Sequence, residues 1–215
     1  MSKLPGKVVA VAKNYAKHAL EMGGSGVKQT RASFFLKPQS SVIFPGASIL
    51  RPAACTDLHH EVELGVYISR RCTRAQAQDW RSYVSGYCLA LDMTARDLQA
   101  QEKKEGAPWT RGKCFDTFSP LGPFIPAADF PEDPHSVELW LKVDGVQRQR
   151  GSALDMMTRI PELLEQISAV MTLEEGDIIL TGTPEGVGPV APGQVITAGI
   201  TGLSEVTFPV AQREY

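Results

Sequence analysis

The chain has 215 residues and a formal net charge of −2, with 22 Lys or Arg against 24 Asp or Glu. The sequence contains no run of basic residues, which argues against nucleic acid or an anionic membrane as a partner. No apolar stretch approaches the roughly 18 residues of a membrane-spanning helix. Its four cysteines show no Cys-x-x-Cys spacing and are interpreted as reduced thiols. We therefore expect a soluble cytoplasmic protein without a cleavable leader, or a mitochondrial one if the source is eukaryotic.

The first half of the chain is expected to alternate between strands and short helices. Apolar or alternating runs predict the strands, while capping patterns and helical periodicity predict the helices. Thr73 and Gln76 form a capping-box pattern, and Gly106 follows the last helix of this half. The strands are expected at residues 7–12, 33–37, 60–68 and 86–92, and the helices at 15–22, 73–84 and 94–104.

The second half is expected to be richer in β-structure. Apolar residues alternate over 137–143 up to Asp144-Gly145, which predicts a β-hairpin with residues 146–149. A helix is predicted over 157–171, with Pro161 in its first turn. No linker or internal repeat divides the chain, so we predict one α+β domain over residues 1–215. The remaining strands are expected at 177–181, 194–197 and 204–210.

Three carboxylates are the first candidates for chemistry. Glu61 and Glu63 stand two apart in a predicted strand, so both point to one face, and Asp92 ends the strand predicted at 86–92. If the three converge they need a cation, and oxygen ligands favour Mg²⁺, Mn²⁺ or Ca²⁺. Two simpler interpretations remain open. The glutamates could face solvent from an amphipathic strand, and Asp92 could only assist the N-terminus of the next helix.

A second candidate lies on the short helix predicted at 15–22. His18 and Glu21 are three residues apart and therefore neighbours on one helix face. A carboxylate that orients an imidazole makes a pair able to activate water, although a surface ion pair is the simpler alternative. Glycines at positions 23, 24 and 26 suit a moving lid, which we place over about residues 14–30.

Two other positions could contribute charge or hydrogen bonds. Lys113 lies in a predicted loop-to-strand stretch, where it could stabilise a developing negative charge or simply be solvated. After the strand at 177–181, glycines let the backbone approach a ligand, and Thr183 offers a hydroxyl and an amide to a carboxylate. A tight proline–glycine turn is the alternative there. The sequence contains no zinc-ligand spacing, P-loop or serine nucleophile elbow.

Five ordered motifs resemble those of one known family. Over nearly its full length the chain resembles the fumarylacetoacetate hydrolase family, in particular its short acylpyruvase branch. The motifs are Asn14-Tyr15-Ala16-Lys17-His18, Phe35-Leu36-Lys37-Pro38, His59-His60-Glu61-Val62-Glu63-Leu64, Leu91-Asp92-Met93-Thr94-Ala95-Arg96-Asp97 and Leu180-Thr181-Gly182-Thr183-Pro184-Glu185-Gly186-Val187-Gly188.

The resemblance implies a mixed β-roll fold with a few short helices, a homodimer, and Mg²⁺ or Mn²⁺ in the site. Where the family often has arginine before the first motif, this chain has Lys13, which cannot form a bidentate pair with a carboxylate. The implied roles are metal ligands for Glu61, Glu63 and Asp92, water activation for His18 with Glu21, catalysis for Lys113, and substrate binding for Arg96, Gln99, Gly182 and Thr183.

The implied activity is hydrolytic C–C cleavage of an acylpyruvate, such as acetylpyruvate or fumarylpyruvate, to pyruvate and a carboxylic acid. The partner is then a small 2-oxo acid. Decarboxylation of oxaloacetate, isomerisation of a 2-oxo diacid, and non-catalytic binding of a keto acid remain as alternatives. The presence of His18 together with Glu21 favours hydrolysis.

Overall fold

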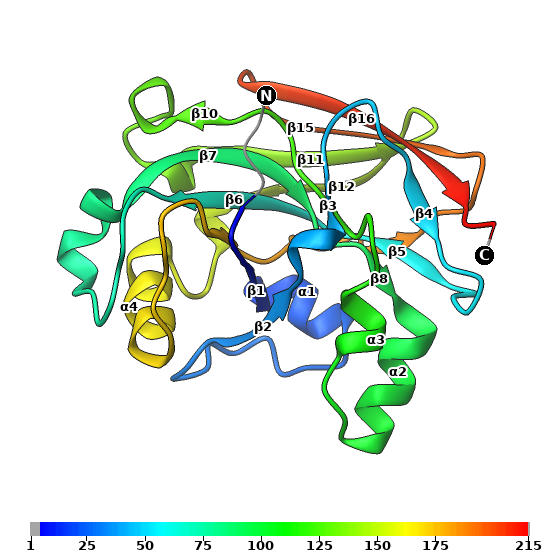
Figure 1. The fold of residues 1–215 in the computed structure, drawn as a ribbon, viewed down its shortest axis with the longest axis horizontal. Helices are drawn as coiled ribbons and strands as arrows, with labels where there is room; N and C mark the ends of the chain where they lie inside the picture. The colour runs from blue at the N-terminus through cyan, green and yellow to red at the C-terminus, as the bar shows by residue number, and fades with distance from the viewer. Residues whose placement is uncertain (1–4, 215) are drawn as a thin grey trace.

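The computed structural model describes residues 5–214, whose strands form four sheets flanked by short helices (Figure 1). The largest sheet has six strands in the order β10-β7-β6-β13-β1-β2, and only the β13–β1 pair is parallel. Its strands are β1 (Val8–Ala12), β2 (Ser33–Lys37), β6 (Val62–Ile68), β7 (Val84–Leu91), β10 (Ile125–Pro126) and β13 (Ile178–Leu180).

A five-stranded sheet in the order β12-β11-β15-β16-β4 contains the predicted hairpin. Asp144 and Gly145 turn the chain between β11 and β12 with φ of 48° and 78°, the left-handed geometry that a tight hairpin requires. Its strands are β4 (Ile49–Arg51), β11 (Glu138–Val143), β12 (Val146–Ser152), β15 (Val195–Ile200) and β16 (Ser204–Gln212). The smaller sheets join β14 (Gly188–Pro189), β5 (Leu58–His60) and β8 (Thr94–Ala95), and β3 (Val42–Ile43) with β9 (Ser119–Pro120).

The helices lie mostly on one side of the strands, in the lower half of Figure 1. Gly106 ends α2 with φ of 67°, and Pro161 lies in the first turn of α4, both as predicted. None of the helices in the described residues is long and apolar enough to span a membrane. The α-helices are α1 (Ala16–Glu21), α2 (Arg96–Glu105), α3 (Thr110–Lys113) and α4 (Ile160–Val170), and the 3₁₀ helices are η1 (Gln39–Ser41), η2 (Ala77–Tyr83), η3 (Ala127–Asp129), η4 (Pro134–Ser136) and η5 (Ala153–Asp155).

Several local predictions were wrong. The capping box does not form, since residue 74 is left-handed (φ 49°) and only the 3₁₀ helix η2 follows. Thr94 belongs to β8, and α2 begins at Arg96. The predicted strand at 60–68 is broken at Glu61, where the chain passes from β5 in one sheet to β6 in another. Lys113 ends the short helix α3 and does not lead into a strand.

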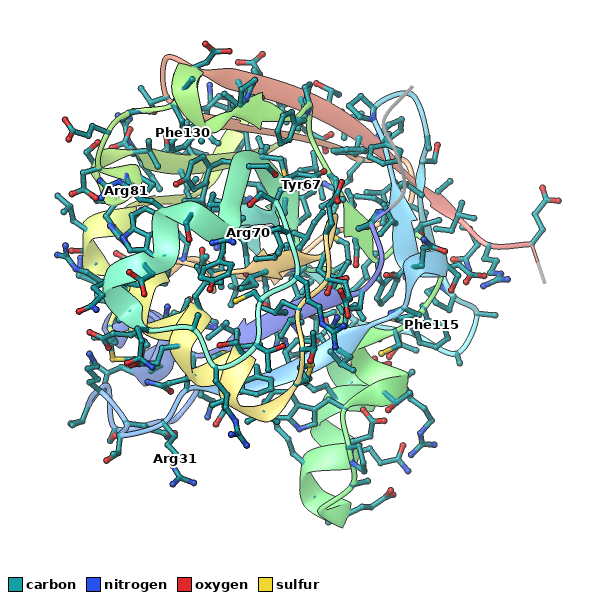
Figure 2. All side chains as sticks on the ribbon, turned by 60° about the vertical axis from the view of Figure 1, so that its left-hand side comes forward. Arg31, Tyr67, Arg70, Arg81, Phe115 and Phe130 are labelled. Atoms are coloured by element: carbon teal, nitrogen blue, oxygen red, sulfur yellow. The ribbon has the colours of Figure 1, made fainter. Side chains whose placement is uncertain are left out.

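The six-stranded sheet is buried on both faces. Along β1, Val9 and Val11 join the main hydrophobic core, whereas Val8 and Ala10 join a second, smaller core on the opposite face. Figure 2 shows side chains packed between the ribbons, while Arg31 points away from the body of the molecule. A polar side chain near the ends of β6 and β7 that adjoin the site is therefore buried whichever face it points to, as Glu63 and Asp92 are.

Candidate active site

The register of β6 against β7 brings the three predicted carboxylates together. Glu63 pairs with Ala90 in this antiparallel ladder. Two residues further along the same register Glu61 lies opposite Asp92, whose backbone N–H donates to the Glu61 carbonyl at 2.9 Å. Because alternate residues share a face, Glu61, Glu63 and Asp92 all point to one side. One carboxylate oxygen from each lies within 4.8 Å of the others.

All three carboxylates are buried, with exposures of 5%, 1% and 2% for Glu61, Glu63 and Asp92. The interpretation of a solvated strand face is therefore wrong, because the second face of this sheet is covered as well. Asp92 does not cap a helix either, since its oxygens bind lysine side chains. Three converging buried oxygen donors fit a hard divalent cation, which would need no imidazole or thiolate ligand here.

Three cationic side chains contact two of these carboxylates. Arg96 donates to Glu61 at 2.5 Å, and Lys113 donates to Glu61 at 3.0 Å and to Asp92 at 2.5 Å. Lys37, whose side chain is fully buried, donates to the other oxygen of Asp92 at 2.5 Å. Among the described residues, Glu63 receives only the backbone N–H of Gly182, at 2.6 Å. Glu63 is thus the carboxylate with the weakest neutralisation.

The pKa values follow this distribution of charge. Burial raises the pKa of Glu61, but the nearby charges of Lys113 and Arg96 together outweigh it and hold that pKa below its ordinary value. For Glu63, burial and the negative charges of Asp92 and Glu61 raise the pKa well above its ordinary value. The three cationic side chains therefore neutralise Glu61 and Asp92 but not Glu63, and a bound divalent ion would supply positive charge to Glu63.

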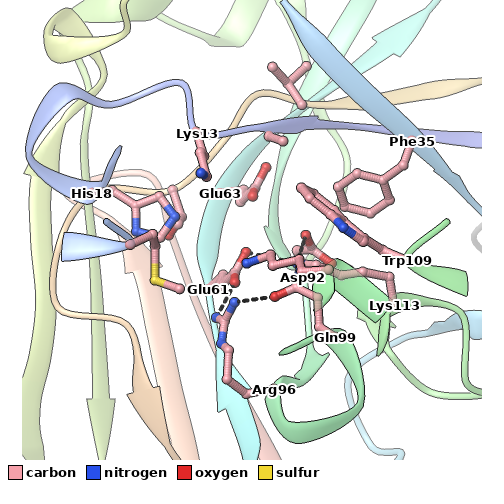
Figure 3. A pocket seen from close by; sticks show the side chains of 15 residues that line it. Lys13, His18, Phe35, Glu61, Glu63, Asp92, Arg96, Gln99, Trp109 and Lys113 are labelled. Atoms are coloured by element: carbon pink, nitrogen blue, oxygen red, sulfur yellow. Dashed lines mark hydrogen bonds and ion pairs between the residues drawn. The ribbon is translucent and has the colours of Figure 1, made fainter. Parts of the chain in front are cut away.

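Helices α2 and α3 position the side chains on one side of this cluster (Figure 3). Arg96 and Gln99 are one turn apart on α2, and the Arg96 guanidinium donates to the Gln99 carbonyl oxygen at 2.8 Å. That contact leaves the Gln99 NH₂ group to donate to a ligand. Lys113 is held from α3, where the buried Glu102 carboxylate accepts the backbone N–H groups of Arg111 and Gly112 at 2.7 and 2.9 Å.

The predicted water-activating pair lies on the other side of the cluster. His18 on α1 is buried, and its Nδ1 lies 3.4 Å from a Glu21 carboxylate oxygen. It lines the same cavity as the three carboxylates, which a purely surface ion pair would not do. Burial lowers the pKa of His18, and the negative charges of Glu61 and Glu21 oppose this shift without reversing it. The imidazole is thus neutral near pH 7 and able to accept a proton.

Three consecutive residues after β13 form hydrogen bonds to residues of β6. The Thr181 hydroxyl donates to the Leu64 carbonyl at 2.9 Å, and the Thr183 hydroxyl donates to the Val62 carbonyl at 2.8 Å. Between them, Gly182 has φ of 94° and donates its N–H to Glu63. The hydroxyl proton of Thr183 is already used, so its backbone N–H is the donor that remains for the predicted carboxylate contact.

Sequence reasoning assigned no role to several side chains of this site. Lys37 belongs to one of the family motifs, and its place at the end of an apolar strand before a proline is a signal for a buried lysine. The sequence contains no signal for the buried position of Glu102, because a glutamate in a polar helix is usually solvated. Trp109 and Phe35 meet edge to face at 5.7 Å, and the Lys113 ammonium lies 5.2 Å from the Phe35 ring centroid.

Known proteins similar to this chain include two mitochondrial enzymes that act on oxaloacetate by name. The mitochondrial oxaloacetate tautomerase FAHD1 of Arabidopsis thaliana is 51% identical over 213 residues, covering 99% of this chain and 94% of the relative. The mitochondrial oxaloacetate decarboxylase of Dictyostelium discoideum is 48% identical, covering 97% and 95%. The expected cytoplasmic location finds no support in these relatives, both of which are mitochondrial by name.

Solved structures extend the comparison to the fold. Fumarylpyruvate hydrolase from Pseudomonas aeruginosa, in complex with Mn²⁺ and pyruvate, superposes with a TM-score of 0.90 at 32% identity, covering 99% of this chain and 98% of that one. The α+β fold of mixed sheets with short helices is thereby confirmed. Residues 7–211 match the model of the fumarylacetoacetate (FAA) hydrolase C-terminal domain, and the chain belongs to this family.

Proposed function

We propose that this chain is a divalent-metal-dependent enzyme that acts on small 2-oxo acids, with oxaloacetate as a substrate. The observation that carries the proposal is the convergence of three buried carboxylates beside Lys113, Arg96 and Gln99 in one cavity. The names of the relatives from Arabidopsis and Dictyostelium, a tautomerase and a decarboxylase of oxaloacetate, support the substrate. Both reactions pass through an enol or enolate of a 2-oxo acid.

Glu61, Glu63 and Asp92 would hold the cation, for which Mg²⁺ and Mn²⁺ fit the oxygen donors and Ca²⁺ is also compatible. When bound, such a cation supplies Lewis-acid chemistry toward the oxygens of a 2-oxo acid. The Mn²⁺ in the structure of the Pseudomonas hydrolase supports a divalent ion in this family.

The charge of each side chain near the proposed metal determines its role in the reaction. The negative charges of Asp92 and Glu61 outweigh the effect of burial and raise the pKa of Lys113, so it is an ammonium throughout the physiological range. Lys113 therefore stabilises negative charge that develops on an enolate oxygen and does not act as a base. Arg96, the NH₂ group of Gln99 and the backbone N–H of Thr183, which line the same cavity, would hold the substrate carboxylate in a fixed orientation. His18 is the neutral group in this cavity that can accept a proton.

Hydrolysis of acylpyruvates is the second candidate, and two observations favour it. The first is the buried pair of His18 and Glu21. The second is a cavity of about 240 Å³ that adjoins the site through Lys13 and Trp109 and leaves room for an acyl group. His18 would take a proton from water, hydroxide would add to the distal carbonyl, and the C–C bond would break to a carboxylic acid and the pyruvate enolate, which is then protonated on carbon.

A direct assay tests both candidates. Purified protein with Mg²⁺ is incubated with oxaloacetate, acetylpyruvate or fumarylpyruvate, and both loss of the enol absorbance and formation of pyruvate are followed. We expect rates well above the metal-only background, and loss of every activity in Glu63→Gln. Substitution of His18 by Ala should reduce hydrolysis more than decarboxylation, because only hydrolysis needs an activated water. Tight binding of pyruvate without turnover of any substrate would instead identify a non-catalytic relative.

A further inference from the structure

Gln149 is a fully buried glutamine on β12 that joins three segments of the candidate site. Its neighbours in that strand, such as Gln147, are exposed, so a buried amide is unusual for this strand. The Gln149 carbonyl oxygen lies 2.9 Å from His60 Nδ1 and 3.1 Å from the Val62 amide nitrogen. Its amide nitrogen lies 2.8 Å from the Thr183 hydroxyl and 2.9 Å from the Pro184 carbonyl.

Two backbone groups fix the orientation of this side chain. A backbone N–H can only donate and a backbone carbonyl can only accept, so the Gln149 oxygen must face Val62 and its NH₂ group must face Pro184. It follows that His60 carries its proton on Nδ1 and donates it to Gln149. The other ring nitrogen, Nε2, is buried and has no partner among the described residues. The orientation of Gln149 thus sets the tautomer of His60, and the two backbone groups set the orientation of Gln149.

The same bonds fix the direction of the Thr183 hydroxyl. It accepts a hydrogen bond from Gln149 and donates its own to Val62. Thr183 is therefore bound on both sides, to β12 through Gln149 and to β6 through Val62. These strands belong to different sheets, so without Gln149 the described side chains would hold Thr183 to β6 alone.

We propose that Gln149 is a positioning residue for the ligand end of the site: it sets the place of Thr183 and Pro184 relative to the strand that carries Glu63. The inference rests on the proposed function, because it assumes that the backbone of Thr183 meets the carboxylate of a 2-oxo acid. Glu63 keeps its position through β6 and Gly182, so Gln149 affects the affinity for the organic ligand more than the affinity for the metal.

Gln149→Met and Gln149→Glu test this role together. Methionine has a similar length and removes all four hydrogen bonds, whereas glutamate keeps the two acceptor contacts to His60 and Val62 and loses the two donor contacts. The exposed Gln147→Met and Gln147→Glu variants are the matched controls. Mn²⁺ binding is measured by electron paramagnetic resonance, and pyruvate binding in saturating Mn²⁺ is measured by calorimetry. Thermal denaturation establishes that each variant is folded.

We expect the pyruvate dissociation constant to rise about tenfold in both Gln149 variants, while that of Mn²⁺ changes by less than about threefold. The Gln147 variants should match the wild type in both constants. Unchanged pyruvate affinity in a folded Gln149 variant overturns the proposal, as does an equal loss for Mn²⁺ and pyruvate. Failure of both variants to fold also overturns it, because Gln149 would then be needed for the core as a whole. If the wild type itself binds no pyruvate, the proposed function is what fails.

Discussion

Among the individual residues of the site, Lys37 has the most unusual environment. Its side chain is fully buried, and its ammonium donates to Asp92 at 2.5 Å and to the Met93 carbonyl at 3.2 Å. Burial lowers the pKa of Lys37, which the charge of Asp92 partly opposes. Lys37 and Lys113 bind the two different carboxylate oxygens of Asp92, and of these two lysines only Lys113 lines the cavity. Its role is therefore to balance the charge of the carboxylate cluster.

Replacement of Lys37 by Met should lower the free energy of unfolding by about 3 kcal/mol, because a buried carboxylate loses its partner. Saturating Mg²⁺ should recover at least about 1 kcal/mol of that loss, since a divalent ion supplies positive charge to Asp92. Urea denaturation with and without Mg²⁺ measures both quantities. Lys104→Met, at an exposed position of α2, is the control and should change stability by less than about 0.5 kcal/mol. An identical loss in both conditions would contradict this account.

The lowered pKa of His18 predicts the pH dependence of hydrolysis. Because the imidazole must be neutral to accept a proton, kcat/KM for acetylpyruvate should be constant above about pH 6.5 and fall only at lower pH. Glu21→Gln removes a negative charge that raises the pKa of His18, so the acid limb should move to still lower pH while the rate at pH 7 drops. A pH–rate profile of the two proteins decides the matter. An acid limb that moves upward in Glu21→Gln would contradict the assignment.

At the scale of elements, the junction of α2 and α3 sets where Lys113 stands relative to Gln99. The buried Glu102 carboxylate binds the amides of Arg111 and Gly112, at the start of α3. Glu102→Gln leaves one of these amides facing an NH₂ group, so α3 should shift. We expect a loss of about 1–2 kcal/mol in stability and a fall of about tenfold in kcat.

Glu105→Gln is the matched control for that substitution, because Glu105 lies in the same helix with an exposed side chain. It should retain both stability and kcat. The measurements are steady-state kinetics on oxaloacetate and urea denaturation of the three proteins. If Glu102→Gln kept the wild-type kcat, the Glu102 carboxylate would not be needed to hold α3 and Lys113 in place.

Regular elements could be predicted from the sequence wherever the pattern repeats over enough residues. The β11–β12 hairpin, α4 and the apolar strand β1 follow from local sequence pattern and turn chemistry alone. The capping box at Thr73 failed because tertiary contacts prevailed locally. The Thr73 hydroxyl lies 3.1 Å from that of Thr172, and the Arg74 amide donates to the Ser168 carbonyl in α4.

The candidate site could be predicted only in part for a related reason. Spacing correctly placed Glu61 and Glu63 on one face, but burial of that face depends on strands far away in the sequence, such as β1 and β13. The approach of Asp92 to Glu61 depends on the β6–β7 register, which spacing within either strand does not contain. The neutralising Lys37 comes from β2, at the edge of the sheet order. Such contacts require the tertiary fold.

For the molecule as a whole, the site joins segments that span most of the chain. His18 lies in the N-terminal segment and Thr183 lies in the last third of the sequence. The proposed metal ligands lie between them, in β6, directly before β6 and directly after β7. An unfolded chain would not hold these groups together. A cation bound by the native state alone therefore stabilises every element that contributes to the site.

Divalent metal should consequently raise the stability of the whole molecule. At a Mg²⁺ concentration of about 100 times Kd the gain is about 2.7 kcal/mol, which for a chain of this size corresponds to a rise of about 5–10 °C in Tm. Glu63→Gln should abolish most of that rise. The variant should lose little stability without metal, since it removes a buried carboxylate with a raised pKa. Differential scanning calorimetry over a Mg²⁺ series measures both effects. If Mg²⁺ raised the Tm of Glu63→Gln as much as that of the wild type, the cation would bind elsewhere, because a metal held by Glu63 cannot stabilise a variant that lacks this carboxylate.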